Sequence, residues 1–252
     1  MRLKPMPPPP STEPGVQPPM EAQRAFWNDW NAAAREHAVG DVSQRQREVA
    51  LGWLEGIGRR DLAIIDLGCG AGWFCTDLKA FGPTTGVDIS DQVLERARER
   101  MPDVRFIAGD ITTLDLGAGA FDVVVTLEVL SHVADQPAFM AGVARILKPG
   151  GVLIMATQNR PILERNEGIA PPKPGQIRKW VNKRELRQLL APHFRIRRLR
   201  TLTPKGNRGF LRYVNSHKLN RIARMALGER AERVKEWLGF GWTLMVFAEK
   251  RG

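Results

Sequence analysis

Apolar and polar positions along the chain alternate between two kinds of pattern. Segments that suit strands occupy residues 62–67, 84–88, 104–110, 121–127 and 152–157, and those at 62–67, 121–127 and 152–157 are almost wholly apolar. Patterns with a helical period separate them, at residues 72–80, 90–101 and 134–147, and Pro149-Gly150-Gly151 reads as a turn. Because the strand-type runs are continuous rather than alternating, we expect both faces of the sheet to be covered. The alternation of strand and helix predicts an α/β fold with a mostly parallel sheet.

The flanking segments extend this pattern. Before it, the sequence predicts amphipathic helices at 20–38 and 43–54, with Ser43 as a possible cap, and a disordered or extended, proline-rich tail at 1–19. After it, the patterns predict a loop at 158–179, a helix at 182–191, a half-exposed strand at 194–202, a basic and partly helical segment at 205–239, and a closing strand at 241–250. We therefore expect a tail and one domain over 20–252, with a helical cap at 20–58 and a core at 62–157.

Composition and cysteine usage limit the class of protein. With 252 residues, of which 43% are hydrophobic, the chain is long enough for one well-buried domain. No apolar stretch approaches the roughly 20 residues of a membrane span, and the N-terminal residues lack the apolar core of a signal peptide. We therefore expect a cytoplasmic protein. The two cysteines, Cys69 and Cys75, predict neither a disulfide framework nor a zinc site, and we expect no metal.

The positive charge is concentrated in the last third of the chain. The formal net charge is +11, and residues 173–252 carry 21 Lys and Arg against 5 Asp and Glu. Such an excess is typical of a surface for nucleic acid, phosphate or an acidic substrate. A solvated basic face without a dedicated partner is the alternative, because the arginines are scattered.

The candidate chemistry begins at a glycine-rich loop between a strand and a helix, Asp66-Leu-Gly68-Cys-Gly70-Ala-Gly72. Glycines allow a sharp turn and a close approach of a ligand to the main chain. Asp88 and Asp110 end the next two strands and Glu128 follows the fourth, and ligands of such sheets bind at these strand ends. A dinucleotide-binding loop needs glycine where this chain has Trp73, which argues against a dinucleotide cofactor.

Five segments in order resemble the class I S-adenosylmethionine-dependent methyltransferases: IIDLGCGAG, GVDIS, IAGDI, FDVVVTLEVLSHV and LKPGGVLIMAT. The resemblance covers residues 62–157 closely. It implies a Rossmann-like, doubly wound, seven-stranded sheet with an antiparallel last strand, an N-terminal helical lid and a helical insertion (205–239) before that strand. Residues 158–252 would form the substrate side. The implied cofactor is S-adenosyl-L-methionine, released as S-adenosyl-L-homocysteine.

The resemblance also implies roles for single residues. Asp66 and the backbone of Gly68 and Gly70 would hold the methionine part of the cofactor, and Asp88 would hold the ribose. Asp110 and Ile111 would hold the adenine, and the backbone around Leu127 and Glu128 would meet the amino group. Further positions expected in the cofactor site are Cys69, Gly72 and Ile89. Asp66 could instead cap the turn, Gly72 could serve helix packing, Asp110 could be a surface residue, and Glu128 could stand back from the ligand.

The segment Glu128-Val-Leu-Ser131-His132-Val carries the candidate base. Many small-molecule members of the family have a glutamate where this chain has Ser131, but His132 is present. A histidine with a near-neutral pKa suits a general base. We interpret His132 as the catalytic base, with Glu128 as the weaker candidate. A role for His132 in ordering the loop is the alternative.

Two further groups are candidates for ligand binding. Trp27 and Trp30 of the first helix could cover the cofactor, where an aromatic face stabilises a sulfonium cation, and Phe26 could meet the substrate. Ordinary packing of these rings is the alternative. In the insertion, a basic cluster could bind an acidic group of the acceptor, or could form a basic surface helix: Arg208, Arg212, Tyr213, His217 and Lys218.

Three functions follow as hypotheses. The first is methylation of an O or N atom of a small-molecule acceptor, possibly acidic, by a monomer or homodimer. The second is methylation of tRNA, rRNA or another nucleic acid through the basic C-terminal third, although the chain has no Asn-Pro-Pro-Tyr or Asp-Pro-Pro-Tyr segment. The third is a non-catalytic, cofactor-binding partner subunit.

Overall fold

The computed structural model describes residues 17–35, 40–206, 208, 212, 221 and 230–252. Three residues of the predicted basic cluster, Tyr213, His217 and Lys218, lie outside the described residues, as does most of the predicted tail.

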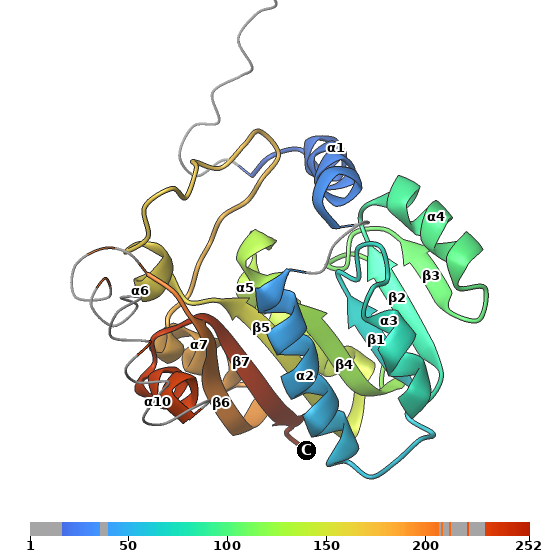
Figure 1. The fold of residues 1–252 in the computed structure, drawn as a ribbon. Helices are drawn as coiled ribbons and strands as arrows, with labels where there is room; N and C mark the ends of the chain where they lie inside the picture. Colours follow the sequence, from blue (N-terminus) through green and yellow to red (C-terminus); the bar gives the residue numbers. More distant parts are fainter. Residues whose placement is uncertain (1–16, 36–39, 207, 209–211, 213–220, 222–229) are drawn as a thin grey trace, which may run out of the picture.

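A seven-stranded sheet forms the centre of the domain (Figure 1). The strand order is β3-β2-β1-β4-β5-β7-β6, and β7 is antiparallel to both β5 and β6. The strands are β1 (Ile64–Leu67), β2 (Thr84–Asp88), β3 (Arg105–Ala108), β4 (Phe121–Leu127), β5 (Leu147–Gln158), β6 (Phe194–Pro204) and β7 (Gly241–Lys250). This arrangement confirms the predicted Rossmann-like fold with an antiparallel last strand.

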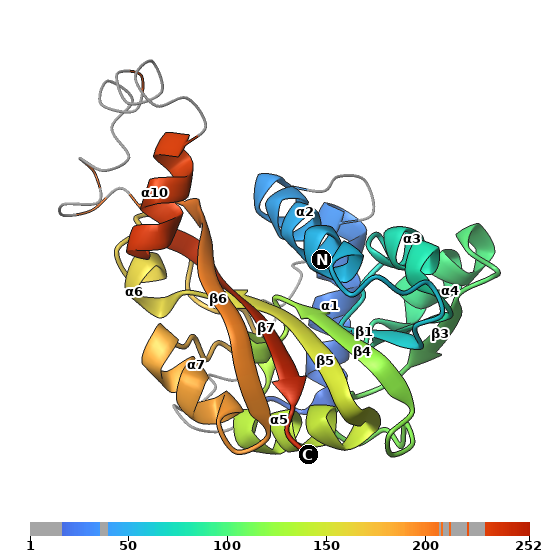
Figure 2. The same ribbon diagram turned by 90° about the horizontal axis from the view of Figure 1, so that it is seen from below.

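Helices cover both faces of the sheet (Figure 2). Neighbouring residues of one strand enter different cores: Ile65 packs in the core with α5 and α7, whereas Ile64 packs in the core with α2 and α3. This explains why the strands are continuously apolar. The helices are α1 (Met20–Trp30), α2 (Asp41–Glu55), α3 (Cys75–Leu78), α4 (Asp91–Arg100), α5 (Gln136–Ile146), α6 (Arg160–Leu163), α7 (Lys183–Leu190) and α10 (Arg230–Leu238). Short turns of helix add η1 (Asn31–Arg35), η2 (Lys79–Phe81) and η3 (Leu130–His132).

Several predicted element boundaries were wrong. The first helix is an α-helix only to Trp30 and continues as a π-helix, and α2 begins two residues before Ser43, whose side chain is buried. The predicted turn at 149–151 lies within β5 as a bulge, because Phe121 pairs with Leu147 and Val123 pairs with Val152. The predicted loop at 158–179 begins with the short helix α6.

Two side-chain hydrogen bonds connect the N-terminal helical segment to the start of α4. Asn28 Nδ2 donates to Asp91 Oδ1 at 3.0 Å, and Asn31 Nδ2 donates to Ser90 Oγ at 2.9 Å. Ser90 stands at the N-cap position of α4 but makes no side-chain capping bond, since its hydroxyl serves this tether instead. The tether places α1 beyond the ends of β1 and β2 (Figure 1). In the described part of the chain, no helix is long and apolar enough to cross a membrane.

Candidate functional site

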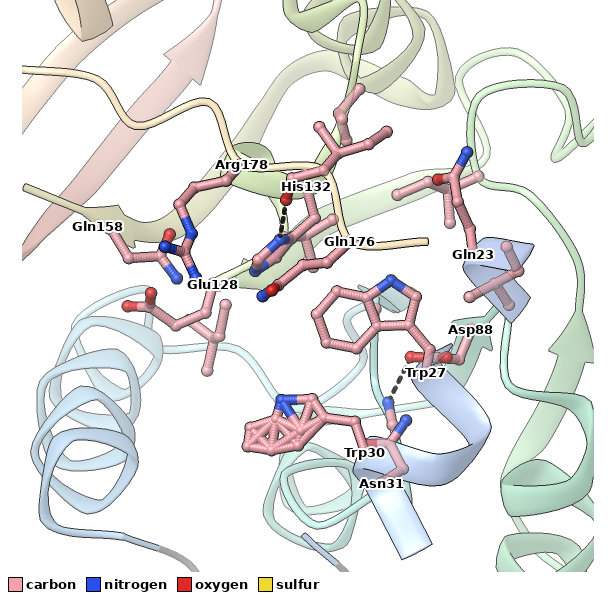
Figure 3. A pocket seen from close by; sticks show the side chains of 18 of the residues that line it. Gln23, Trp27, Trp30, Asn31, Asp88, Glu128, His132, Gln158, Gln176 and Arg178 are labelled. Carbon is pink, nitrogen blue, oxygen red and sulfur yellow. Dashed lines mark hydrogen bonds between the residues drawn. The ribbon is translucent and has the colours of Figure 1, made fainter. Parts of the chain in front are cut away.

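A cavity of about 640 Å³ lies at the carboxyl ends of the parallel strands. Its walls come from the loops that follow β1, β2, β3 and β4, from α1 and α2, from the 158–180 segment and from Trp242 at the start of β7. Its volume is in the range of small-molecule and cofactor sites. Ten of its side chains are labelled in Figure 3. The predicted cofactor residues that line it are Trp27, Trp30, Gly68, Cys69, Gly70, Asp88, Ile89, Asp110, Ile111 and Leu127.

Asp88 joins the glycine loop to the start of α4. Its Oδ2 accepts a hydrogen bond from the Gly70 N–H at 2.8 Å, and its Oδ1 accepts one from the Ser90 N–H at 2.8 Å. An ionised carboxylate has about four acceptor positions, and these backbone groups use two of them. The carboxylate lines the cavity although it is only 8% exposed. It is therefore fixed in place with acceptor capacity left for a ligand.

Gly68 brings the glycine loop against the segment that follows β4. Its φ is +77°, and a Cβ at this position would stand 2.1 Å from Val129 Cγ2. No side chain fits between the two segments. The close approach of their backbones forms the floor of the cavity.

Two residues of the predicted cofactor set, Asp66 and Gly72, and the predicted substrate residue Phe26 do not line the cavity. Asp66 is buried behind the loop, where the Cys75 Sγ lies 3.7 Å from its Oδ2, and burial raises its pKa to about 7. A Cβ on Gly72 would stand 2.7 Å from Met101 Cε, so this glycine serves packing against α4. Phe26 packs beside Gly175.

The Asp110 carboxylate also holds its own loop. Its Oδ1 accepts hydrogen bonds from the Thr112 N–H at 2.9 Å and from the Thr112 hydroxyl at 2.8 Å. Because Asp110 and Ile111 both line the cavity, this turn fixes the wall next to β3. Adenine binding by these residues stays a prediction.

Glu128 lies where β4 ends and has an unusual backbone conformation. Its φ is +65°, in the region that non-glycine residues rarely adopt. Its Oε1 accepts hydrogen bonds from Gln46 Nε2 at 2.5 Å and from the Thr243 hydroxyl at 2.9 Å. These partners, from α2 and β7, hold the carboxylate at the cavity wall. Strain that is maintained by such contacts is typical of functional sites.

His132 lines the cavity, and its Nε2 is the ring nitrogen that can accept a hydrogen bond. Its Nδ1 is 2.8 Å from the Ile177 carbonyl oxygen, which can only accept, so Nδ1 carries the proton and Nε2 keeps its lone pair. The ring packs edge-on against Trp27, with centroids 4.6 Å apart. Burial lowers the pKa of His132 to about 4, and the nearby Arg178 adds to this effect. The expected near-neutral pKa was therefore wrong, and the imidazole is neutral at pH 7.

The aromatic residues of the cavity come from separate parts of the chain. Trp27 and Trp30 stack with centroids 6.4 Å apart, and both line the cavity. Trp73, Trp180 and Trp242 also line it, so five of the seven tryptophans surround one space. The first helix thus forms part of the cavity wall through Trp27 and Trp30, and its role as a lid stays a prediction.

The predicted basic cluster does not reach this space in the described part of the chain. Arg208 pairs with Glu167 at 3.5 Å, and neither Arg208 nor Arg212 lines the cavity. The polar lining that sequence reasoning missed includes Asn31, Ser43, Gln46, Gln158, Gln176 and Arg178. These residues belong to no motif, and only the fold brings them together.

Comparison with known proteins agrees with this architecture. Residues 65–155 match the family model described as a methyltransferase domain. A ubiquinone biosynthesis O-methyltransferase from Caulobacter vibrioides is 33% identical over 141 residues, which cover 52% of this chain and 54% of that protein. The aligned part thus spans about half the length of this relative.

Solved structures share the fold over most of the chain. The N-methyltransferase NodS from Bradyrhizobium japonicum, in complex with S-adenosyl-L-homocysteine, matches with a TM-score of 0.62 at 15% identity and covers 92% of this chain and 100% of its own. An S-adenosylmethionine-dependent methyltransferase from Mesorhizobium loti matches with a TM-score of 0.57 at 22% identity, over 79% of this chain and 96% of its own. Residues 65–155 thus match a methyltransferase domain, and the chain shares its fold with solved S-adenosylmethionine-dependent methyltransferases.

Proposed function

We propose that the protein transfers a methyl group from S-adenosyl-L-methionine to an O or N atom of a small-molecule acceptor. The observation that carries this proposal is one cavity that joins the glycine loop and Asp88 to a histidine with a free ring nitrogen, beneath a tryptophan lid. The relatives named as O- and N-methyltransferases support the same chemistry.

The residues present fit the cofactor. Gly68 has no room for a side chain, Asp88 has acceptor capacity next to the loop, and Asp110 lines the wall beyond it. These are the positions expected to hold the methionine part, the ribose and the adenine. When bound, the cofactor supplies an electrophilic methyl group on a sulfonium.

The protein's own part is alignment, exclusion of water and removal of a proton. Trp27 and Trp30 close the cavity above the loop, which shields the reacting groups from solvent. The fixed walls hold the acceptor in line for displacement. His132 Nε2 is the proposed base, because Nδ1 is committed to the Ile177 carbonyl. Glu128 is the weaker candidate, since two side chains already donate to its Oε1.

Substitution of His132 separates the two roles considered for it. His132→Ala is expected to lower kcat by about 10²- to 10⁴-fold, the usual contribution of a general base, and to leave the affinity for S-adenosyl-L-homocysteine within about twofold. His132→Asn can still donate a hydrogen bond to the Ile177 carbonyl but has no basic nitrogen. A loss of turnover in both variants supports the base, whereas full turnover in His132→Asn would assign His132 to loop ordering.

The pKa of His132 also predicts a pH dependence of stability. Because the folded-state pKa is about 4 and the usual value is 6.5, the unfolded chain binds more protons at this residue between these values. The contribution of neutral His132 is thus complete above pH 6.5 and is lost as the pH falls toward 4. Urea unfolding at pH 7.5 and 5.0 is expected to show a smaller loss for His132→Asn than for the wild type. An equal loss in both proteins contradicts the assignment.

Nucleic-acid methylation receives less support from the described residues. On the basic strand β6, Arg197 pairs with Glu249, Arg198 lies over the Phe247 ring and Arg200 lies over the Trp53 ring. These arginines therefore cover the sheet and α2, which agrees with the solvated-face interpretation of the C-terminal charge.

Isothermal titration with S-adenosyl-L-methionine and, separately, with NAD tests the proposal. We expect micromolar affinity for the first and no measurable binding of the second, because Trp73 occupies the position where a dinucleotide loop needs glycine. Binding of NAD alone, or of neither ligand, contradicts the proposed function.

A further inference from the structure

Arg178 is a cation at the cavity without an acidic partner among the described residues. It lines the cavity, and its guanidinium lies 5.1 Å from the centroid of the Trp180 ring. Its Nη1 donates to the Ala170 carbonyl at 2.7 Å. In the ranges that the structure describes, no Asp or Glu oxygen lies within ion-pair distance of it, and burial lowers its pKa. A guanidinium held at a cavity in this way favours an anionic ligand.

Two amide oxygens of the same cavity also lack partners. Gln46 is 1% exposed, and its Nε2 must face the Glu128 carboxylate, since a carboxylate oxygen accepts hydrogen bonds. This fixes the orientation of the amide and leaves the buried Oε1 without a hydrogen bond. Gln158 Oε1 is buried and unpaired as well. Both oxygens need a donor, which a hydroxyl or amino group of a ligand supplies.

The cavity combines polar side chains with aromatic walls. Figure 3 draws Arg178, Gln158, the Glu128 carboxylate and the His132 ring toward one side of the view of the cavity. Trp27, Trp180 and Trp242 supply aromatic walls. Flat walls of this kind bind a planar ring through its faces and edges.

We propose that the acceptor is an aromatic carboxylate, whose carboxylate pairs with Arg178 and whose hydroxyl or amino substituent hydrogen-bonds to the amide oxygens near His132. This inference rests on the proposed methyltransferase function. A carboxylate fits better than a phosphate, because a single guanidinium with one N–H group already committed matches one negative charge rather than nearly two. Arg178 would take the role that the sequence assigned to Arg208 and Arg212.

Such binding also affects the base. Arg178 is one of the causes of the lowered pKa of His132. A carboxylate paired with Arg178 neutralises that charge and raises the basicity of Nε2. The acceptor would thereby prepare the group that takes its proton.

The test measures binding of paired probes to the full-length protein saturated with S-adenosyl-L-homocysteine. The probes are 3,4-dihydroxybenzoate, 3,4-dihydroxycinnamate and 2-aminobenzoate, each compared with its uncharged primary amide. We expect at least one carboxylate to bind ten- to a hundredfold more tightly than its amide, in line with a charge-assisted hydrogen bond. Arg178→Gln is expected to remove this preference, whereas Arg165→Gln, which removes an exposed charge from the same segment, keeps it.

The outcomes separate the two proposals. Equal affinity for acids and amides, a preference that survives Arg178→Gln, or no binding of any carboxylate to the S-adenosyl-L-homocysteine complex overturns the acceptor class only. Failure to bind S-adenosyl-L-homocysteine overturns the proposed function, and the inference falls with it. Thermal unfolding of both variants, expected within a few degrees of the wild type, verifies that the comparison concerns folded proteins.

Discussion

Asp88→Ala is expected to weaken the affinity for S-adenosyl-L-homocysteine by about a hundredfold or more. The carboxylate has two tasks: it accepts the N–H groups of Gly70 and Ser90, and it lines the cavity where the ribose is expected. Hydrogen bonds to a charged group contribute about 1.5–3 kcal/mol each, so the loss of two ligand bonds alone reaches this magnitude. The two N–H groups also lose their partner, and we expect the unfolding free energy to fall by about 2 kcal/mol.

Two further variants make this experiment specific. Asp88→Asn keeps one acceptor oxygen and removes the charge, and is expected to be intermediate in both affinity and stability. Asp115→Asn removes a charge from a side chain that is 88% exposed, and is expected to change neither. Titration calorimetry and urea unfolding provide the two readouts. Affinity for S-adenosyl-L-homocysteine within threefold of the wild type in Asp88→Ala would remove Asp88 from the cofactor site.

The fold could be predicted from the sequence because its signals are local. A buried parallel strand such as 121–127 is apolar throughout, and a helix such as 90–101 has its own period, so order and type of element follow directly. The errors arose where tertiary contacts decide. The Pro149-Gly150-Gly151 turn became a bulge because β5 continues to pair with β4 on both sides of it.

The sequence could predict only those residues of the candidate site that belong to a recognisable motif. Asp88 ends β2 and His132 lies in η3 after β4, and the motifs around them predicted their place at the cavity. Gln46, Gln158 and Arg178 come from α2, the end of β5 and a loop, and no spacing in the sequence connects them. Two motif residues do not line the cavity: Asp66 is buried, and Gly72 packs against Met101 at the end of α4.

Gly68→Ala is expected to lower the unfolding free energy by about 2–5 kcal/mol and to abolish measurable cofactor binding. Two costs add. A residue other than glycine at φ +77° is strained by about 1–2 kcal/mol, and the new methyl group would stand 2.1 Å from Val129 Cγ2, an overpacking of about 1–3 kcal/mol. Val129 cannot retreat alone, because Glu128 before it is held by Gln46 and Thr243.

The two costs can be measured separately. Gly119→Ala places a methyl group at φ +60° with no atom within 4 Å, so it is expected to cost only the backbone strain. The double variant Gly68→Ala/Val129→Ala lacks the Val129 methyl group that would collide with Ala at position 68. Most of the overpacking cost is therefore expected to be absent, and a double-mutant cycle is expected to measure this as a favourable coupling energy.

Additive effects in that cycle would mean that the loop accommodates alanine without touching Val129. A favourable coupling accompanied by regained binding of S-adenosyl-L-homocysteine would instead show that Gly68 acts through the segment that carries Glu128 and His132. In that case Gly68 determines both the shape of the cofactor loop and the positions of Glu128 and His132. New contacts to the cofactor alone could then not restore the activity lost on substitution of Gly68.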